Sequence, residues 1–226
     1  MKRIISILFA ITISMVALAQ KDVTKFMGIP VDGTISEMKA KLKAKGFKEA
    51  NYGIENQLVG RFNDTDVLVM PMENNGKVYR VCVTNLNPYS ETDVRIAYNN
   101  LCYLFCRNSK YSPLKEEKEY MIPDTEDISY EITVNNKSYE APFIQMDSIT
   151  AQKIISDALD SRFTEEEIQN PTPEQRKEMR EFGVKSLGEI TRNKFVWFRI
   201  GQISYGRYII PLYYDNGYNK NNGEDL

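Results

Sequence analysis

The stretch TDVLVMPMENNGKVYRVCVTN, Thr65 to Asn85, decides the fold of this 226-residue chain. On both sides of Asn75-Gly76 the apolar residues recur at every second position, a period typical of β-strands. Asn-Gly is a preferred pair for a two-residue turn between antiparallel strands, because both residues accept positive φ. The stretch therefore predicts a β-hairpin, and NQLVGRFND (56–64) in front of it predicts a third strand of the same sheet.

Details of this hairpin carry further expectations. Pro71 has no N–H to donate to a ladder, so we expect it at a sheet edge or at a bulge. Alternation predicts that Tyr79, Val81 and Val83 face the core. It then turns Cys82 toward the opposite face of the sheet.

A capped helix is predicted in front of the strands, within GIPVDGTISEMKAKLKAKGF (28–47). Thr34 and Glu37 have the spacing of a capping box, in which each side chain accepts a hydrogen bond from the other residue's backbone N–H. Gly46 suits the left-handed residue that follows a helix. These signals predict a helix from Ile35 to Lys45.

The remaining elements are predicted from the two-residue period of strands and the 3.6-residue period of helices. SETDVRIAYNNLCYLFCRN (90–108) predicts a second helix, and ISYEITVNNKSYEAPFIQM (128–146) predicts a hairpin that turns at Asn135-Asn136. Residues 148–160 predict a third helix. KFVWFRIGQISYGRYIIPLYYDN (194–216) predicts a closing aromatic hairpin.

The order α-β-β-β-α-β-β-α-β-β predicts an α+β fold, a mainly antiparallel sheet of six to seven strands with helices on one face. We expect residues 20–215 to form a single domain, with sub-units 22–110 and 125–215 as an alternative division. The segment 161–190 is dense in charge and carries its own helix starts, so it is interpreted as a helical insertion. Residues 216–226 are interpreted as a disordered tail.

The first nineteen residues have the pattern of a signal peptide. Lys2 and Arg3 precede an apolar run from Ile4 to Val16, and Ala17-Leu18-Ala19 offers small residues for cleavage. The apolar run is shorter than the roughly 20 residues needed to cross a bilayer. The pattern predicts export to the periplasm or outside the cell, cleavage after Ala19, and a protein that does not span the membrane.

Composition excludes several classes of function. Without residues 1–19 the chain has 27 basic and 31 acidic side chains, a net charge of −4, which argues against a nucleic-acid partner. The chain has no histidine, so Ser-His-Asp and Cys-His catalysis, His-ligated zinc and imidazole pH switches are excluded. No motif indicates a cofactor or a metal.

Three cysteines leave their role open. A zinc site built on the three cysteines would need a fourth ligand, and the chain has no histidine to supply it. Cys102 and Cys106 are four residues apart on one predicted helix, where nearly parallel Cβ directions suit a disulfide poorly. We interpret them and Cys82 as small buried side chains, with a disulfide in an oxidising compartment and thiol chemistry as alternatives.

The closing hairpin is the one segment that indicates binding. Eight aromatic side chains fall within residues 195–218, and alternation places Trp197 and Arg199 on the face opposite to the core. Exposed Trp, Tyr and Arg are enriched in protein interfaces. The sequence therefore predicts a binding surface that includes Trp197, Arg199, Tyr205 and Tyr208.

Several stretches also carry a family resemblance. FMGIPVDGTISEMKAKLKAKGF, LVGRFND, KVYRVCVTN and VRIAYNNLCYLF resemble uncharacterised exported proteins of Bacteroidetes-type bacteria, over roughly Asp22 to Tyr111. That resemblance implies no assigned activity and no catalytic residues. The helix-then-strands order is similar to BLIP-like modules and to outer-membrane-assembly lipoprotein modules, which implies action by binding proteins.

These observations favour a non-catalytic exported module that binds a protein or a glycan of the cell envelope. A hydrolase of glycans that uses two carboxylates is one alternative, because the separation of such a pair is not visible in a sequence. A purely structural envelope protein is the other.

Overall fold

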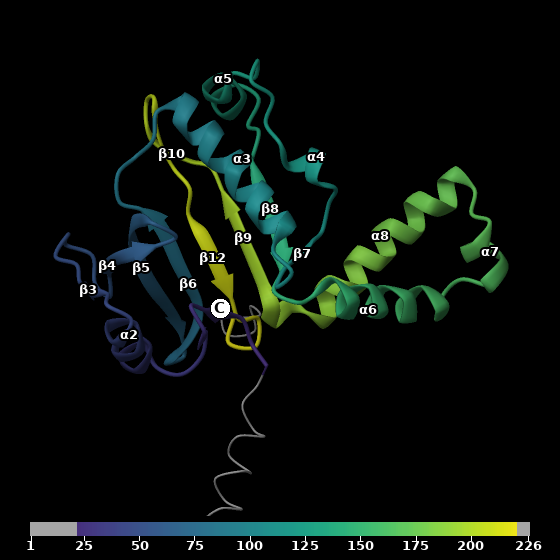
Figure 1. The fold of residues 1–226 in the computed structure, drawn as a ribbon, viewed down its shortest axis with the longest axis horizontal. Coiled ribbons are helices and arrows are strands. Elements are labelled where there is room, and N and C mark those ends of the chain that lie inside the picture. The colour runs from purple at the N-terminus through teal and green to yellow at the C-terminus, as the bar shows by residue number, and fades with distance from the viewer. Residues whose placement is uncertain (1–21, 221–226) are drawn as a thin grey trace, which may run out of the picture.

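The computed structural model describes residues 22–220, and its main feature is an eight-stranded antiparallel sheet (Figure 1). The α+β class is confirmed, while the sheet has one strand more than the upper end of the expected range. In spatial order its strands are β3 (Lys48–Glu49), β4 (Leu58–Phe62), β5 (Thr65–Asn74), β6 (Lys77–Asn85), β12 (Leu212–Asp215), β9 (Phe195–Arg199), β8 (Glu140–Ile144) and β7 (Ser112–Pro113).

Two small ladders, seven α-helices and the 3₁₀ helix Arg192–Lys194 complete the described part of the chain. The ladders are β1 (Lys25–Phe26) with β2 (Ile29–Pro30), and β10 (Gly201–Ser204) with β11 (Arg207–Ile209). The helices are α2 (Ile35–Ala44), α3 (Glu91–Arg107), α4 (Glu117–Tyr120), α5 (Ile128–Thr133), α6 (Ser148–Asp160), α7 (Glu165–Gln169) and α8 (Pro173–Ile190).

The β5–β6 hairpin forms at the turn that the sequence predicts. Asn75 and Gly76 both have positive φ, 49° and 72°, as a two-residue turn of this kind requires. The pairing of β5 with β4 ends at Val69, so Pro71 has no β4 partner and lies at a local edge of the sheet. It also lies just before a bulge at Met72 and Glu73. Both expected locations for the proline therefore apply.

The bulge changes the core face of β6. Val81 and Val83 are buried as expected, and Cys82 points to the other face and is half-buried. The third core position belongs to Val78, which is fully buried, and not to Tyr79. A bulge adds one residue to the ladder, so alternation counted from Val81 does not continue past it.

Helix α2 starts and stops as its sequence predicts. The Thr34 side chain accepts from the N–H of Glu37, and the Glu37 carboxylate accepts from the N–H of Thr34 at 2.9 Å. At the other end the N–H groups of Gly46 and Phe47 reach back to carbonyls of the last turn, which is a Schellman motif. Phe47 then lies on Gly60, where a Cβ would come within 2.5 Å of its ring.

One core joins α2 and α3 to the same face of the sheet. A row of buried residues crosses five strands, and its members are Ala141, Phe198, Leu212, Val83 and Val69. Met38 and Leu42 of α2 and Tyr98 of α3 belong to this core, and the Tyr98 ring lies 5.3 Å from that of Phe198. Because β12 pairs with both β6 and β9, the segments 22–110 and 125–215 share one sheet.

The predicted hairpin at residues 128–146 is wrong in its first half. Residues Ile128–Thr133 form α5, because the Asp127 carboxylate accepts from the N–H of Tyr130 at 2.8 Å and caps a helical turn. Ile128 and Ile132, four residues apart, then pack on the core from one side of that helix. Only Glu140–Ile144 is a strand, and it pairs with β7 and β9.

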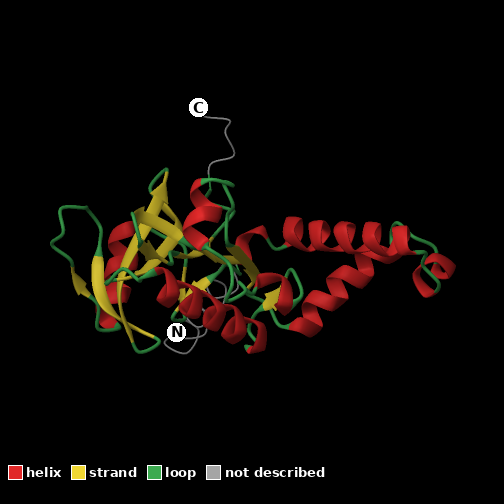
Figure 2. Cartoon of the chain, turned by 90° about the horizontal axis from the view of Figure 1, so that it is seen from above, coloured by secondary structure: helices red, strands yellow, loops and turns green. Residues whose placement is uncertain are grey.

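The charged segment 161–190 forms α7 and α8, and together with α6 these helices extend from the sheet as an arm (Figures 1 and 2). Thr164 and Thr172 cap α7 and α8 as their sequence signals predict. Gly183 lets α8 approach α6 closely, since a Cβ there would lie 2.9 Å from Ile155. The two helices thus form a hairpin of helices.

The base of this arm corrects the expectation that the helices occupy one face. Ala151 of α6 and Leu187 of α8 bury a small second core with Ile144, and Phe195 packs against it. Strand alternation directs Ile144 and Phe195 away from the main core. The arm is therefore anchored on the opposite face from α2 and α3.

Residues 216–220, expected to begin a disordered tail, are bound to the domain. Asn216 is fully buried, and its side chain donates to the carbonyl of Val31 at 2.8 Å. Asn219 donates to Asp32 and to the carbonyl of Val78. The remainder of that predicted tail and the predicted signal peptide lie outside the described residues. Among the described helices none is both long enough and apolar enough to span a membrane.

Candidate functional site

The second face of the large sheet carries a row of apolar and aromatic side chains. Across β8, β9, β12, β6 and β5 the paired residues are Pro142, Trp197, Tyr213, Cys82 and Met70. Because α2 and α3 pack on the other face, all five stay half-buried. We call this surface the aromatic face, and it consists of Met70, Arg80, Cys82, Pro142, Trp197, Arg199, Tyr213 and Asp215.

Two stacked rings form its centre. The rings of Trp197 and Tyr213 lie on neighbouring strands with centroids 4.4 Å apart and planes 29° apart. The guanidinium carbon of Arg80 lies 4.6 Å from the Tyr213 ring and 5.4 Å from the Trp197 ring. Such stacking and cation–π contacts fix the rings in one arrangement.

Asp215 holds this cluster in place. Its two carboxylate oxygens accept from Nε and Nη2 of Arg80, each at 2.6 Å, and the second also accepts from Nε1 of Trp197 at 3.1 Å. Burial acts to lower the pKa of Arg80, but the hydrogen bonds and charge of Asp215 outweigh it and raise that pKa. The guanidinium therefore stays charged, and the pair is neutral as a unit.

A shallow hollow of about 360 Å³ lies next to the cluster. Its lining combines apolar and charged groups, namely Arg80, Glu140, Pro142, Phe195, Trp197, Asp215 and Lys220. A hollow lined by both apolar and charged groups can accept one protruding side chain of a partner.

The four side chains predicted for binding are not together. Trp197 is half-buried and Arg199 exposed, both on the aromatic face. Tyr205 is 94% exposed at the turn between β10 and β11, which belong to a separate small ladder. The prediction that Tyr208 lies on an exposed surface is wrong, because it is fully buried and its backbone pairs with Tyr89.

The predicted binding surface contained only Trp197 and Arg199 of the aromatic face, and the charged members that it missed are Arg80 and Asp215. Alternation contained a partial signal, because Arg80 is two residues before Cys82 and Asp215 is two after Tyr213. That β12 pairs with β6, and in which register, is visible only in the structure.

The three cysteines offer no activated thiol. All are free, and burial raises the pKa of Cys82 to about 11 and that of Cys102 to about 12. Burial also raises the pKa of Cys106. The reactive form of cysteine is the thiolate, so the raised pKa values disfavour these side chains as nucleophiles near neutral pH.

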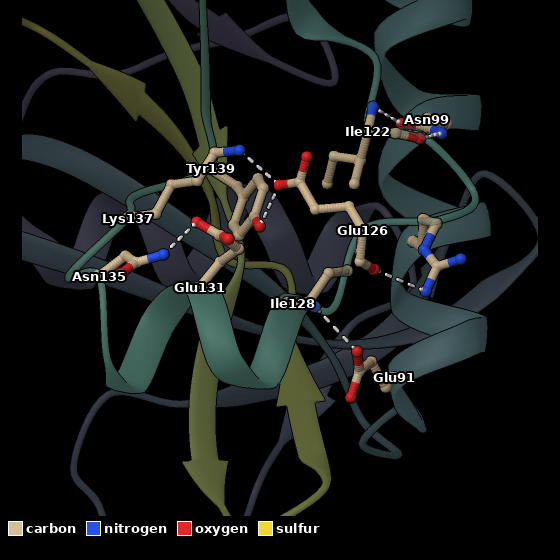
Figure 3. A network of polar contacts seen from close by, with 10 residues as sticks. Glu91, Asn99, Ile122, Glu126, Ile128, Glu131, Asn135, Lys137 and Tyr139 are labelled. Atoms are coloured by element: carbon tan, nitrogen blue, oxygen red, sulfur yellow. Dashed lines mark hydrogen bonds and ion pairs between the residues drawn. The ribbon is translucent and has the colours of Figure 1, made fainter.

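A second polar cluster lies between α3, α5 and the start of β8 (Figure 3). The Glu126 carboxylate accepts from the ammonium of Lys137 and the hydroxyl of Tyr139. Burial acts to raise the pKa of Glu126, but these two hydrogen bonds outweigh it and lower that pKa. Glu126 is therefore ionised near neutral pH and is a poor candidate for a general acid.

The rest of this cluster fastens the chain to α3 (Figure 3). Asn99 bonds both backbone groups of Ile122 at 2.9 Å, and Glu91 accepts from the N–H of Ile128 at 2.8 Å. These contacts have a structural role, and they add nothing to the hypothesis of a carboxylate hydrolase. Within residues 22–220 no group of three His, Cys, Asp or Glu side chains is arranged to hold a metal ion.

Comparison with known proteins finds no match, whether the chain is compared with protein families, with curated proteins or with solved structures. The resemblances to exported Bacteroidetes-type proteins and to BLIP-like modules stay predictions. The aromatic face is therefore interpreted from its own chemistry.

Proposed function

We propose that this chain is a non-catalytic exported module of the cell envelope that binds another protein through the aromatic face. The observation that carries the proposal is the stacked pair of Trp197 and Tyr213, held by a neutralised Arg80–Asp215 pair on a half-buried sheet face. Export rests on the signal-peptide pattern of residues 1–19.

The composition of the face supports a protein partner. Trp, Tyr, Met and Arg are enriched in the centres of protein interfaces, and Lys and Glu are depleted there. The aromatic face has this composition at its centre, with Glu140 and Arg199 paired across strands at its rim. A rigid centre also reduces the entropy lost on binding, because the rings are already held in place.

A glycan partner is less well supported by the ring geometry. Sugar rings bind by lying flat against an aromatic ring that offers its face. Here Trp197 and Tyr213 stack on each other, and Arg80 lies over both. A partner would mainly meet ring edges and the Arg199 side chain, which suits a protein surface.

The test is affinity capture from an envelope extract with the mature chain as bait, followed by direct binding of each captured protein. Arg199→Glu is the first variant, because this side chain is exposed and its change should leave the fold intact. We expect it, and Trp197→Ala with folding verified, to lose the partner. Tyr205→Ala is the matched control, since it removes an exposed ring outside the face. A partner retained equally by all variants, or a glycan as the only ligand, contradicts the proposal.

A further inference from the structure

A groove runs along α3 on the face of the sheet opposite to the aromatic face. It has two adjoining parts, of about 830 Å³ and about 220 Å³. Both parts share walls of Phe62, Asn63, Leu101 and Leu104, so they form one continuous depression. We call it the α3 groove, and its volume is in the range of sites that bind small molecules.

The groove lies between α3 and the β4–β5 turn, because Leu101 and Leu104 line both parts together with Phe62 and Asn63. Helix α2 packs on β5 and β6, while Tyr98 places α3 against Phe198 of β9 (Figure 1). The floor of the smaller part is apolar and includes Val67, Val83 and Leu212, which are buried side chains of the sheet.

The α3 side of the smaller part is also apolar. Its wall contains Ala97, Leu101 and Leu104, and Leu104 remains 57% exposed although it is a large aliphatic side chain. Exposed apolar surface in a concave site favours the binding of an alkyl chain, because binding removes both apolar surfaces from water.

The other end of the groove carries positive charge. Lys25 and Lys110 both line the larger part, and neither ammonium has an ion-pair partner within residues 22–220. The third lysine there, Lys194, is already paired with Asp22. Asp147 also lines this part and keeps its negative charge, because its carboxylate accepts from the N–H of Thr150 at 3.0 Å and from its hydroxyl at 2.8 Å, which lowers its pKa.

This end of the groove therefore attracts an anion. The last carbonyls of α3 oppose this, but a helix C-terminus amounts to only about half a negative charge. The two unpaired ammonium groups still carry more charge than the Asp147 carboxylate and the helix end together. A ligand that fits both ends has an alkyl chain and one anionic group.

We propose that the α3 groove binds a free long-chain fatty acid, with the alkyl chain on Leu101, Leu104 and the sheet floor and the carboxylate near Lys25 and Lys110. The lengthwise division of the groove into an apolar part and a cationic part carries the proposal. It is independent of the proposed protein-binding function, because the two surfaces are on opposite faces of one sheet.

The test is titration of the mature chain with hexadecanoate below its micelle concentration, followed by calorimetry and by displacement of a fluorescent fatty acid. We expect saturable one-to-one binding. Leu104→Glu places a charge on the apolar wall, and Lys25→Glu with Lys110→Glu reverses the charge at the other end. Each change should weaken binding about tenfold or more, and hexadecanol should bind more weakly than hexadecanoate.

Two matched controls make the test specific. Ile96→Glu alters another aliphatic residue of α3, 55% exposed and absent from the groove walls, and Lys177→Glu reverses an exposed lysine on α8. Both should bind within about twofold of the parent chain. Absence of saturable binding overturns the proposal. Equal loss in groove and control variants, or binding that high salt abolishes and Leu104→Glu does not change, also overturns it.

Discussion

Replacing Asp215 by alanine should destabilise the domain and disturb the aromatic face together. The side chains of Arg80 and Asp215 are only 17% and 9% exposed, and they share two hydrogen bonds of 2.6 Å. Removal of the carboxylate leaves Arg80 as an unpaired charge that is largely out of water. It also removes the acceptor of the Trp197 N–H.

The size of the effect follows from these contacts. Breaking a fully buried ion pair costs about 3–5 kcal/mol, and the remaining exposure of Arg80 lets water recover part of that cost. We therefore expect Asp215→Ala to lower the free energy of unfolding by roughly 2–4 kcal/mol. Replacing both partners, as Arg80→Met with Asp215→Leu, should cost less, because no charge is left unpaired.

Urea unfolding followed by circular dichroism measures the free energies of the single and double variants. Trp197 is the only tryptophan in the chain, so its fluorescence reports directly on the aromatic face. We expect its native emission to change in Asp215→Ala, because the indole loses its acceptor and its Arg80 neighbour is released. A loss below about 0.5 kcal/mol with unchanged emission would refute the reasoning, because that is the value of an ordinary exposed pair.

Three further predictions concern other parts of the molecule. Because the folded pKa of Glu126 is lowered from its ordinary value of 4.5, the stability it contributes is present above pH 4.5 and is lost as pH falls through the lower folded pKa. Glu126→Gln should therefore destabilise the protein near neutral pH and flatten the acid side of its stability profile, as measured by thermal melts between about pH 2 and pH 7. Gly60→Ala should cost roughly 1–3 kcal/mol in urea unfolding, since the new Cβ would meet the Phe47 ring at 2.5 Å; an unchanged midpoint would show that the ring moves freely. Iodoacetamide near pH 8 should label Cys82 and Cys102 far more slowly in the native than in the unfolded chain, because burial raises both pKa values; equal rates by mass spectrometry would contradict this.

Local signals predicted local structure well where a few neighbouring residues decide the conformation. The capping box of Thr34 and Glu37 and the Asn75-Gly76 turn both form as expected. Prediction failed where the same spacing of apolar residues is compatible with both a strand and a helix. ISYEIT places Ile128 and Ile132 at a spacing that suits a strand face or a helix face, and the Asp127 cap decided for the helix.

The candidate site was only partly visible from the sequence for a related reason. Alternation along residues 195–199 predicted that Trp197 and Arg199 lie on one face of the sheet, and in the structure they do. It could not show that Tyr208 is buried, because that depends on its pairing with Tyr89 in a distant segment.

By itself, the sequence determined most of the local elements, the α+β class and the lack of histidine chemistry, because caps, turns, periodicity and composition depend on residues close together in the chain. Only the tertiary structure decided that β12 pairs with both β6 and β9, which brings Asp215 to Arg80 and Tyr213 to Trp197 across separations of 135 and 16 residues. It also decided that Leu101 and Leu104 of α3 lie beside the β4–β5 turn and so form the α3 groove. Strand order and helix placement arise from burial summed over the whole core, and no short stretch of sequence contains that sum.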